Sequence, residues 1–547
     1  MIVKFIKLVI KKLFLFLKMD KRTFFILIFI TFLGLFLHFY KINQSPPCIN
    51  ADEAAFSYNS YSILKTGKDE FGQFLPIRFK SFSDYKMPLL FYLNVPFIYF
   101  FGLNLWSIKL INAFILLFFP WLIYSLTNYL FKNKKISLLS SFLSVVCWAV
   151  QSMTRQLHEA FLTSFLITLS SYFFLLAKDK KKIKYQIFFF IALLLSLFSY
   201  QSSRIFGLMF LILTIFYYLK RQLNKKFILG IILILILFLI SDLIYKPKRV
   251  INLFFLNNPG LSLKINELRG EGGSKIIYNK LTVGFKERVF EYLKYFSPQF
   301  LVINGDENYR FGFPQFLSMI TPVEYFFFIA GLYYLFKNKE KNRFYILFLM
   351  MISPISGSLT WANPSLPRTF FIIIPILITT AYGFLNFINN FKKQNYFLIL
   401  TLNIILFLFF QFYNWDFYLN HYPKKAITIH AWQCGYKELT DYIKNNYQKF
   451  DKFYITKESG PPYIFLLFFL KYPPKEYQKQ AGSGPIDQYG FSQSEKFDKF
   501  IFNLDYHSQE KNIAIIGRPH DFPEEKNLKK IIFQNEPVFY IKEILSD

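Results

Sequence analysis

Long apolar segments separated by short basic loops constrain this chain more than any other feature of its sequence. Many of the apolar runs reach the roughly 17–25 residues that a helix needs to cross a bilayer. Hydrophobic residues make up 54% of the 547 residues. Charged residues make up only 18%, compared with about 25% in soluble domains. The sequence therefore predicts a polytopic, mainly α-helical membrane protein.

The placement of the basic residues predicts the topology. The formal net charge is +30, and Lys and Arg cluster in short loops between apolar segments, for example at 132–135, 178–184 and 337–343. Cytoplasmic loops carry such an excess, so this charge indicates orientation in a membrane and argues against nucleic-acid binding. With these loops in the cytoplasm, we expect about eleven transmembrane helices, a cytoplasmic N-terminus and an extracytoplasmic C-terminus. The expected helices cover residues 24–40, 107–131, 136–152, 161–177, 185–200, 205–219, 227–244, 323–336, 344–360, 369–388 and 396–412.

Two apolar segments outside this set need their own interpretation. Residues 1–22 are basic and apolar without a small-residue cleavage site, which favours a cytoplasmic interfacial segment over a signal peptide. If the segment from Leu89 to Leu103 crossed the membrane, every later basic loop would move to the outside. We therefore expect it to be interfacial or re-entrant.

The composition becomes that of a soluble domain after residue 412. We expect a transmembrane domain over 23–412 with outer loops at 41–106 and 245–322, followed by a small extracytoplasmic α/β domain over 413–547. The elements expected in that domain are a helix at 436–443 and strands at 452–456 and 513–517. The apolar run 464–470 is too short to span a membrane. It belongs either to this domain or to a helix on the bilayer surface.

The cysteines and glycines exclude several common kinds of site. Cys48, Cys147 and Cys434 do not have the spacing of a metal site. Cys48 and Cys434 both lie outside in this topology, which permits a disulfide between them. No Gly-rich phosphate-binding loop follows a predicted strand.

Charged residues gather in the outer loops, although these loops are far apart in the sequence. Charged groups are costly to desolvate beside a membrane, so their convergence on one face predicts a functional site there. The residues concerned are Asp52, Glu53, Lys86, Arg155, His158, Glu159, Arg204, Asp306, Glu307, Arg310 and Arg368.

Three of these features together resemble a known family. They are the acidic pair Asp52-Glu53 in the first outer loop, the Lys86-Met87-Pro88 motif before an apolar segment, and the charged turn Arg155 to Glu159 after the third span. The pattern is similar to the GT-C glycosyltransferases, and most of all to the group of dolichyl-phosphate-mannose protein mannosyltransferases and aminoarabinose lipid A transferases. This resemblance implies transfer of a sugar from a polyprenyl-phosphate donor to an extracytoplasmic acceptor, by a single inverting displacement.

The resemblance also implies roles for the acidic residues and the lysine. Asp52 is expected to be the general base, and Glu53 to support it or to hold the acceptor. Lys86 is expected to bind the carrier phosphate, while His158 and Glu159 assist near the first-loop carboxylate. Alternative interpretations are structural: Asp52 as a helix N-cap, Lys86 as an interfacial lysine, and His158-Glu159 as a surface turn.

The remaining residues receive binding roles. Arg204 and Arg368 are candidates for the phosphate, because their forked donors suit phosphate oxygens, and Arg155, beside His158 and Glu159, is a further candidate for binding the substrate. The alternative for Arg204 and Arg368 is an arginine at the lipid headgroup boundary. Asp306 and Glu307 are expected to shape the acceptor side.

The expected partners are a polyprenyl-phosphate sugar donor, a lipid, protein or glycan acceptor and membrane lipids, without nucleic acid. We expect no cofactor and no metal, although two acids and a histidine also suit a divalent cation. A transporter or lipid flippase in the plasma membrane is the alternative function, and a non-catalytic envelope protein is a third. Transporters place polar residues at the bilayer centre, whereas here the charges collect at outer helix ends, which favours the enzyme.

Overall fold

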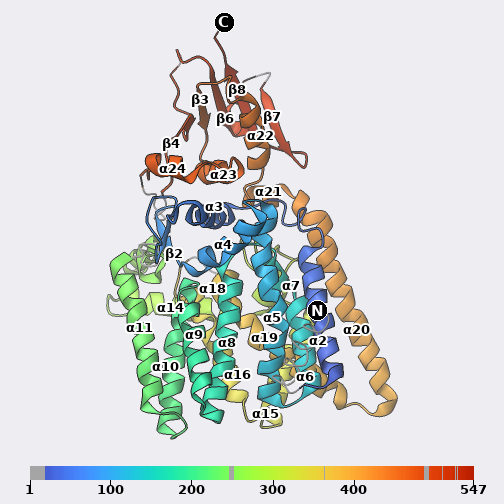
Figure 1. The fold of residues 1–547 in the computed structure, drawn as a ribbon. Coiled ribbons are helices and arrows are strands. Elements are labelled where there is room, and N and C mark those ends of the chain that lie inside the picture. Colours follow the sequence, from blue (N-terminus) through green and yellow to red (C-terminus); the bar gives the residue numbers. More distant parts are fainter. Residues whose placement is uncertain are drawn as a thin grey trace, which may run out of the picture.

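The computed structural model describes residues 19–245, 252–361, 364–485, 492–507, 509–523, 525 and 528–546. It shows a helical bundle, a layer of short elements over one end of the bundle, and an α/β domain above that layer (Figure 1). Residues 1–18 of the expected interfacial segment 1–22 lie outside the described residues. The first described helix begins at Lys21.

The bundle contains a helix at each of the eleven expected positions. Seven of the described helices are long and apolar enough to cross a membrane, and a bent pair at 134–154 makes an eighth. The helices at the other three positions, α9, α15 and α16, are shorter. The bounds are α2 Lys21–Phe39, α5 Leu105–Phe131, α6 Lys134–Val146, α7 Trp148–Thr154, α8 Glu159–Lys180, α9 Ile183–Leu197, α10 Arg204–Leu219, α11 Lys225–Tyr245, α15 Pro322–Lys337, α16 Arg343–Ile352, α19 Ile373–Asn389 and α20 Lys393–Asp416. The expectation of a mainly helical, polytopic membrane protein is confirmed.

The third expected span is broken. Helices α6 and α7 meet at Cys147 with a bend of 54°. The backbone N–H of Ala149 and the thiol of Cys147 both donate to the carbonyl of Met319, from the loop before α15. The break therefore brings this loop against backbone groups that a continuous helix would have used internally.

The layer over the bundle contains α3 Ala51–Thr66, the two-stranded β1 Phe79–Ser81 and β2 Asp84–Lys86, and α4 Leu89–Phe101. Asn50 caps α3, and the Glu53 carboxylate accepts the backbone N–H of Asn50 in return. Asn50, and not Asp52, is thus the N-cap. Helix α4 lies between α3 and the end of the bundle in Figure 1, as the interfacial alternative for this segment predicts.

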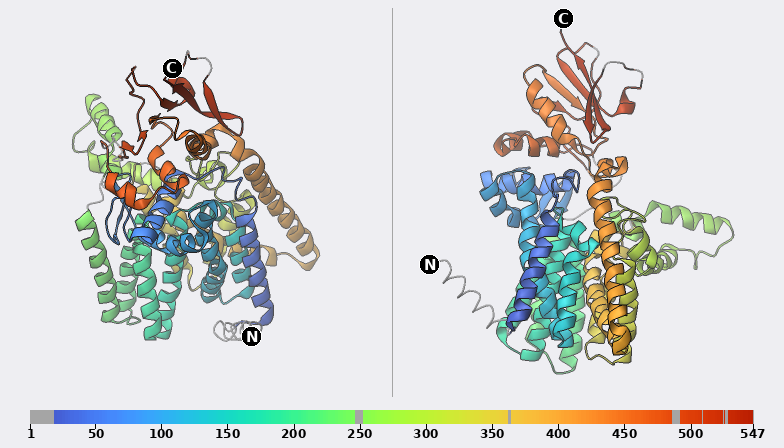
Figure 2. Two further views of the ribbon diagram at one scale, coloured as in Figure 1. Left: turned by 45° about the horizontal axis from the view of Figure 1, so that its top comes forward. Right: turned by 90° about the vertical axis from the view of Figure 1, so that its right-hand side faces the viewer.

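The long outer loop and the segments around the last helices contain short elements. These are η1 Gln201–Ser203, η2 Phe255–Asn257, α13 Pro259–Gly270, α14 Lys280–Lys294, η3 Gln299–Asn304, α17 Ile355–Ser358, α18 Leu366–Thr369, η4 Phe370–Ile372, η5 Phe417–His421 and η6 Tyr422–Lys424. Figure 2 shows that part of the long outer loop projects from the side of the bundle.

The C-terminal domain is built on a mixed six-stranded sheet of order β4-β5-β3-β6-β8-β7. Strand β3 pairs in parallel with β5 and β6, and the other pairs are antiparallel. The elements are α21 Ala426–Ala431, α22 Tyr436–Asn446, β3 Lys452–Ile455, α23 Pro462–Phe469, α24 Pro474–Gln480, β4 Lys496–Phe497, β5 Phe500–Ile501, β6 Ile513–Gly517, β7 Lys529–Phe533 and β8 Glu536–Ile544. The expected helix and both expected strands are present.

Helix α23 resolves the alternatives for the apolar run at 464–470. Its side chains from Tyr463 to Phe468 are buried and belong to the same hydrophobic core as α3. The segment is therefore core between the domain and the layer over the bundle. A disulfide between Cys48 and Cys434 joins the start of this layer to the domain, as the sequence permitted.

Candidate active site

Asp52 lies in the first turn of α3 between two cations from different parts of the chain. Its carboxylate is 2.5 Å from Nζ of Lys86 and 3.6 Å from a guanidinium nitrogen of Arg310. The Asp52 side chain is 38% exposed, whereas that of Lys86 is only 9% exposed. The carboxylate is thus accessible from outside, with two positive charges beside it.

Strand pairing and two aromatic rings fix the position of the Lys86 side chain. Lys86 ends β2, which pairs with β1 in register Phe79 to Lys86. Its ammonium lies over the rings of Phe56 and Phe82, at 4.8 and 5.2 Å from their centroids. Aromatic faces stabilise a cation from which water is partly removed. A lysine fixed in this way presents one compact charge toward the site.

Arg310 was expected on the same membrane face as Asp52, but no role was assigned to it from the sequence. The preceding residue, Tyr309, accepts a hydrogen bond at its carbonyl from the hydroxyl of Tyr422 at 2.5 Å. Trp432 in turn donates to that hydroxyl. The segment that enters the C-terminal domain therefore holds the loop that brings Arg310 to Asp52.

Glu53 has a different environment from its neighbour Asp52. It is fully buried, and its Oε1 is 2.7 Å from Nζ of Lys109 in α5. The same oxygen accepts the backbone N–H of Leu157 at 2.8 Å. These bonds join α3, α5 and the turn before α8. Of the two roles expected for Glu53, the geometry favours support of Asp52 over contact with the acceptor.

His158 and Glu159 lie at the start of α8, close to this junction. His158 is the N-cap, and its Nδ1 accepts the N–H of Ala160 at 3.1 Å. Neutral His158 therefore carries its hydrogen on Nε2. Its ring meets those of Tyr200 and Phe311 edge-to-face, each at 5.6 Å. Since Phe311 follows Arg310 in the chain, the expected pair does come near the Asp52 cluster.

Arg155, which the sequence made a candidate for substrate binding, contacts backbone carbonyls instead. It is fully buried and donates to four backbone carbonyls at the outer end of α2 and in the loop that follows. The acceptors are the carbonyls of Leu37, His38, Tyr40 and Ser45. Buried carbonyls beyond a helix end need such donors, so Arg155 has a structural role.

Arg204 belongs to a separate ion-pair group. Asp242 of α11 accepts from Arg204 at 3.0 Å and from Arg78 at 2.7 Å. The side-chain amide of Gln201 donates to the carbonyl of Tyr85. These contacts bind the β1–β2 segment to α10 and α11, which places the strand carrying Lys86 on that side of the bundle.

Asp306 and Arg368 are brought together, and Glu307 is not part of their group. Asp306 is buried and accepts the backbone N–H groups of Asn308 and Leu366. Burial raises the pKa of Asp306 to about 6, against the lowering effect of those bonds and of Arg368 and Arg310. Arg368 donates to the Thr360 hydroxyl. Glu307 is exposed.

A further buried carboxyl group, that of Glu70, interacts electrostatically with Lys86. It is fully buried in the loop after α3. Burial raises its pKa to about 8, while the nearby Asn59 side chain and the charge of Lys86 act in the opposite direction. Its charge interacts with three tyrosine hydroxyl groups. They belong to Tyr58 of α3 and to Tyr463 and Tyr477 of the C-terminal domain.

Among the described residues, potential metal ligands do not gather around Asp52. Among the residues that the structure describes, the one group with metal-ligand geometry is Glu458, His520 and Asp521 in the C-terminal domain. Its Glu458 and His520 already pair with each other at 2.7 Å. The geometry around Asp52 is that of an acid between cations.

Comparisons with known proteins agree with this architecture. Residues 85–245 match the family model described as dolichyl-phosphate-mannose-protein mannosyltransferase, and no curated protein sequence matches the chain. The crystal structure of ArnT from Cupriavidus metallidurans in the apo state superposes with a TM-score of 0.53 at 10% identity, covering 94% of this chain and 97% of that one. The structure of the same protein bound to undecaprenyl phosphate gives 0.51 at 10% identity, with the same coverage. The chain therefore has the GT-C fold of ArnT, and its residues 85–245 share the sequence pattern of the mannosyltransferase model.

Proposed function

We propose that this protein is a membrane glycosyltransferase that moves a sugar from a polyprenyl-phosphate donor to an acceptor on the side of the C-terminal domain. The observation that carries the proposal is the accessible Asp52 carboxylate between Lys86 and Arg310. Single-displacement transfer needs a base for the acceptor proton and cations for the departing phosphate, and this group offers both.

The donor changes the contacts of this group. A phosphate that binds Lys86 and Arg310 replaces Asp52 as the partner of both cations. A carboxylate without cationic partners binds a proton more readily, so donor binding prepares Asp52 to deprotonate the acceptor hydroxyl. Charge then develops on the phosphate oxygen that leaves the anomeric carbon, where Lys86 and Arg310 stabilise it.

His158, Glu159 and Glu53 take supporting roles in this account. Glu53 joins the first turn of α3 to Leu157, so it sets the position of His158 relative to Asp52. The His158–Glu159 pair is proposed to lie beside the sugar or acceptor. Asp306 and Arg368 are proposed to shape the acceptor side.

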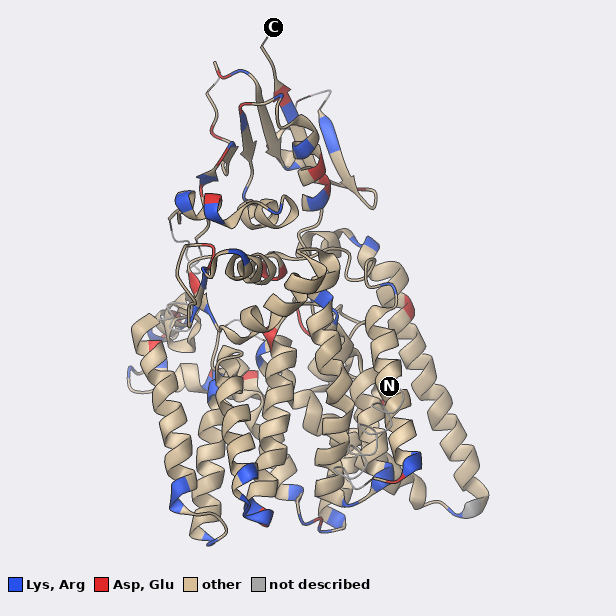
Figure 3. Cartoon of the chain, in the orientation of Figure 1, with Lys and Arg blue, Asp and Glu red and all other residues tan. Residues whose placement is uncertain are grey.

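The orientation is supported by charge and by covalent chemistry. Lys and Arg gather at the bundle end away from the C-terminal domain (Figure 3). Cytoplasmic loops carry such an excess, and disulfides such as Cys48–Cys434 persist in oxidising compartments. We therefore propose that the C-terminal domain and the site are extracytoplasmic and that the bundle lies in the plasma membrane.

The test uses the full-length protein in liposomes with polyprenyl-phosphate sugars labelled in the sugar, and membranes of the source organism as acceptor. We expect release of polyprenyl phosphate together with label in the acceptor fraction. Movement of intact donor across the bilayer without its cleavage would instead show a flippase. Neither cleavage nor movement of any donor would also contradict the proposal.

A further inference from the structure

Helix α14 in the long outer loop is amphipathic, and its apolar side is exposed. Val283 belongs to one hydrophobic cluster with Leu261 and Ile265 of α13. Leu281 and Phe285 are each two residues from Val283, which is about 200° around a helix, so they lie on the side of α14 away from α13. Both are 68% exposed. A surface helix normally turns its apolar side to the core, so this side of α14 needs another partner.

The charged residues of α14 leave this apolar side free of charge. Glu287 lies toward α13, where its carboxylate is 2.8 Å from Nζ of Lys264. Arg288 is closer to the apolar side, but its guanidinium is buried and donates to the carbonyl of Thr360. The exposed surface around Leu281 is therefore apolar.

A contact with α16 shows how deep this side of α14 lies. Tyr292 follows Phe285 by two helical turns, on the same side, and its hydroxyl donates to the carbonyl of Met351. Helix α16 begins at Arg343, directly after a basic loop at the end of the bundle away from the C-terminal domain. Met351 is about 12 Å along α16 from that start, and the hydrocarbon core of a bilayer is about 30 Å thick. The apolar side of α14 therefore meets the bundle within the membrane thickness.

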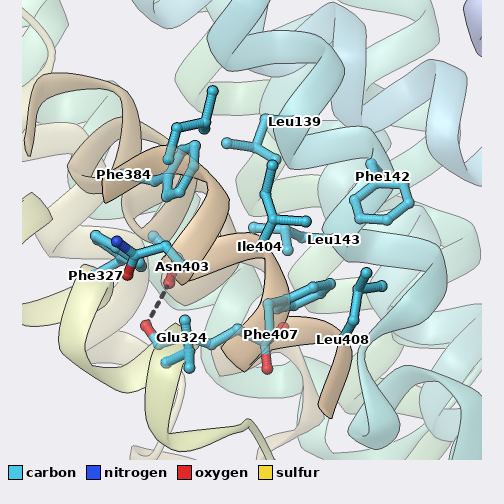
Figure 4. Close-up of a pocket in the computed structure, with 13 residues that line it drawn as sticks. Leu139, Phe142, Leu143, Glu324, Phe327, Phe384, Asn403, Ile404, Phe407 and Leu408 are labelled. Atoms are coloured by element: carbon cyan, nitrogen blue, oxygen red, sulfur yellow. Dashed lines mark hydrogen bonds between the residues drawn. The ribbon is translucent and has the colours of Figure 1, made fainter. Parts of the chain in front are cut away.

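The surface beside this contact faces lipid. Met351 is 50% exposed on the outside of the bundle. Figure 2 shows part of the long outer loop running sideways from the bundle. Inside the bundle, by contrast, apolar side chains face one another, as they do around the cavity of about 310 Å³ between α6, α15, α19 and α20 (Figure 4). Leu281 and Phe285 instead continue the exposed apolar surface of α16.

We propose that the apolar side of α14 is seated in the bilayer leaflet nearer the C-terminal domain, with Leu281, Phe285 and Val289 among the lipid chains. Amphipathic helices bind membranes in this way, with their apolar side buried by about 5–10 Å and their charged side toward the headgroups. Lys280 and Lys286 are exposed, and their long side chains can reach lipid phosphates.

This seat also supports one part of the candidate site. The carbonyl of Thr360 accepts from Arg288 of α14, and its hydroxyl accepts from Arg368. Lipid that holds α14 therefore also holds the segment next to Arg368. The position of α14 in lipid does not depend on which reaction the site catalyses.

Spin labels on introduced cysteines test the position of α14. The full-length protein is reconstituted in nanodiscs of phosphatidylcholine and phosphatidylglycerol. Cys48 and Cys434 form a disulfide and Cys147 is buried, so the label reacts at the introduced cysteine. Phe285→Cys carries the label on the apolar side of α14, and Leu281→Cys is an independent second variant on that side.

Two controls match each other in exposure, at 59%. Leu233→Cys on α11 reports hydrocarbon, and Asp441→Cys on α22 reports water. Molecular oxygen partitions into hydrocarbon, whereas a polar nickel chelate stays in water, so we expect the ratio of their collision rates at Phe285→Cys to be about tenfold that at Asp441→Cys and close to that at Leu233→Cys. A ratio like that of Asp441→Cys in both α14 variants would overturn the inference. Protection from both reagents would show a protein cover and would overturn it as well.

Discussion

Truncation of the adjacent residues Asp52 and Glu53 is expected to lower the stability of the protein by very different amounts. Glu53 is fully buried and pairs with Lys109, whose side chain is 6% exposed. Removing one partner of a buried pair leaves the other charge uncompensated, at a cost of about 3–5 kcal/mol. The N–H of Leu157 loses its acceptor as well. We therefore expect Glu53→Ala to destabilise the protein strongly.

Asp52→Ala provides the contrast. Asp52 is 38% exposed, so water replaces part of its interaction with Lys86, and we expect the loss of this pair to cost less than the loss of the buried Glu53–Lys109 pair. We expect a smaller decrease in the apparent melting temperature in detergent for Asp52→Ala than for Glu53→Ala. Glu53→Ala with Lys109→Met should recover much of the loss, because no buried charge then remains unpaired. Equal melting temperatures for the two single variants would refute this reasoning.

Three further predictions concern stability, covalent structure and donor binding. The pKa of Glu70 is raised to about 8 in the folded state, so the folded protein keeps a proton that the unfolded chain releases near pH 4.5. The free energy of unfolding therefore falls by about 5 kcal/mol as the pH rises from about 4.5 to 8. Glu70→Gln should flatten the melting temperature across that window, and an unchanged pH profile would contradict this. Reduction of the Cys48–Cys434 disulfide, which closes a separation of 386 residues, should lower stability by about 2–4 kcal/mol, with Cys48→Ser insensitive to the reductant. Lys86→Gln should raise the KM for donor at least tenfold, since a charged hydrogen bond contributes about 1.5–3 kcal/mol; an unchanged KM would remove Lys86 from the phosphate site.

Much of the bundle could be predicted because membrane helices must satisfy their backbone internally and need long apolar runs. Helix α22 and strands β3 and β6 were also predictable, whereas features that depend on distant contacts were not. The break at Cys147 depends on the carbonyl of Met319, which is 172 residues away. Helix α23 resembles a surface helix in sequence, and its burial comes from packing against α3.

The site was predictable as a set of loops but not residue by residue. Sequence cannot distinguish Asp52 from Glu53, because exposure depends on which face of α3 meets α5. Lys109 had a signal that was missed: it is a charged residue inside an apolar span, which requires a partner. Arg310 was in the set of charged outer-loop residues, but its contact with Asp52 had no signal, since it depends on a hydrogen bond from Tyr422 near the far end of the chain.

The most direct test of the central claim is sugar transfer by Asp52→Asn in liposomes. Asp416→Asn is the matched control, because Asp416 is 44% exposed and pairs with His421 outside the site. The account predicts loss of transfer by at least a hundredfold in Asp52→Asn, the low end of the range for general base catalysis, with normal folding and a control like the wild type. Normal transfer by Asp52→Asn would contradict it.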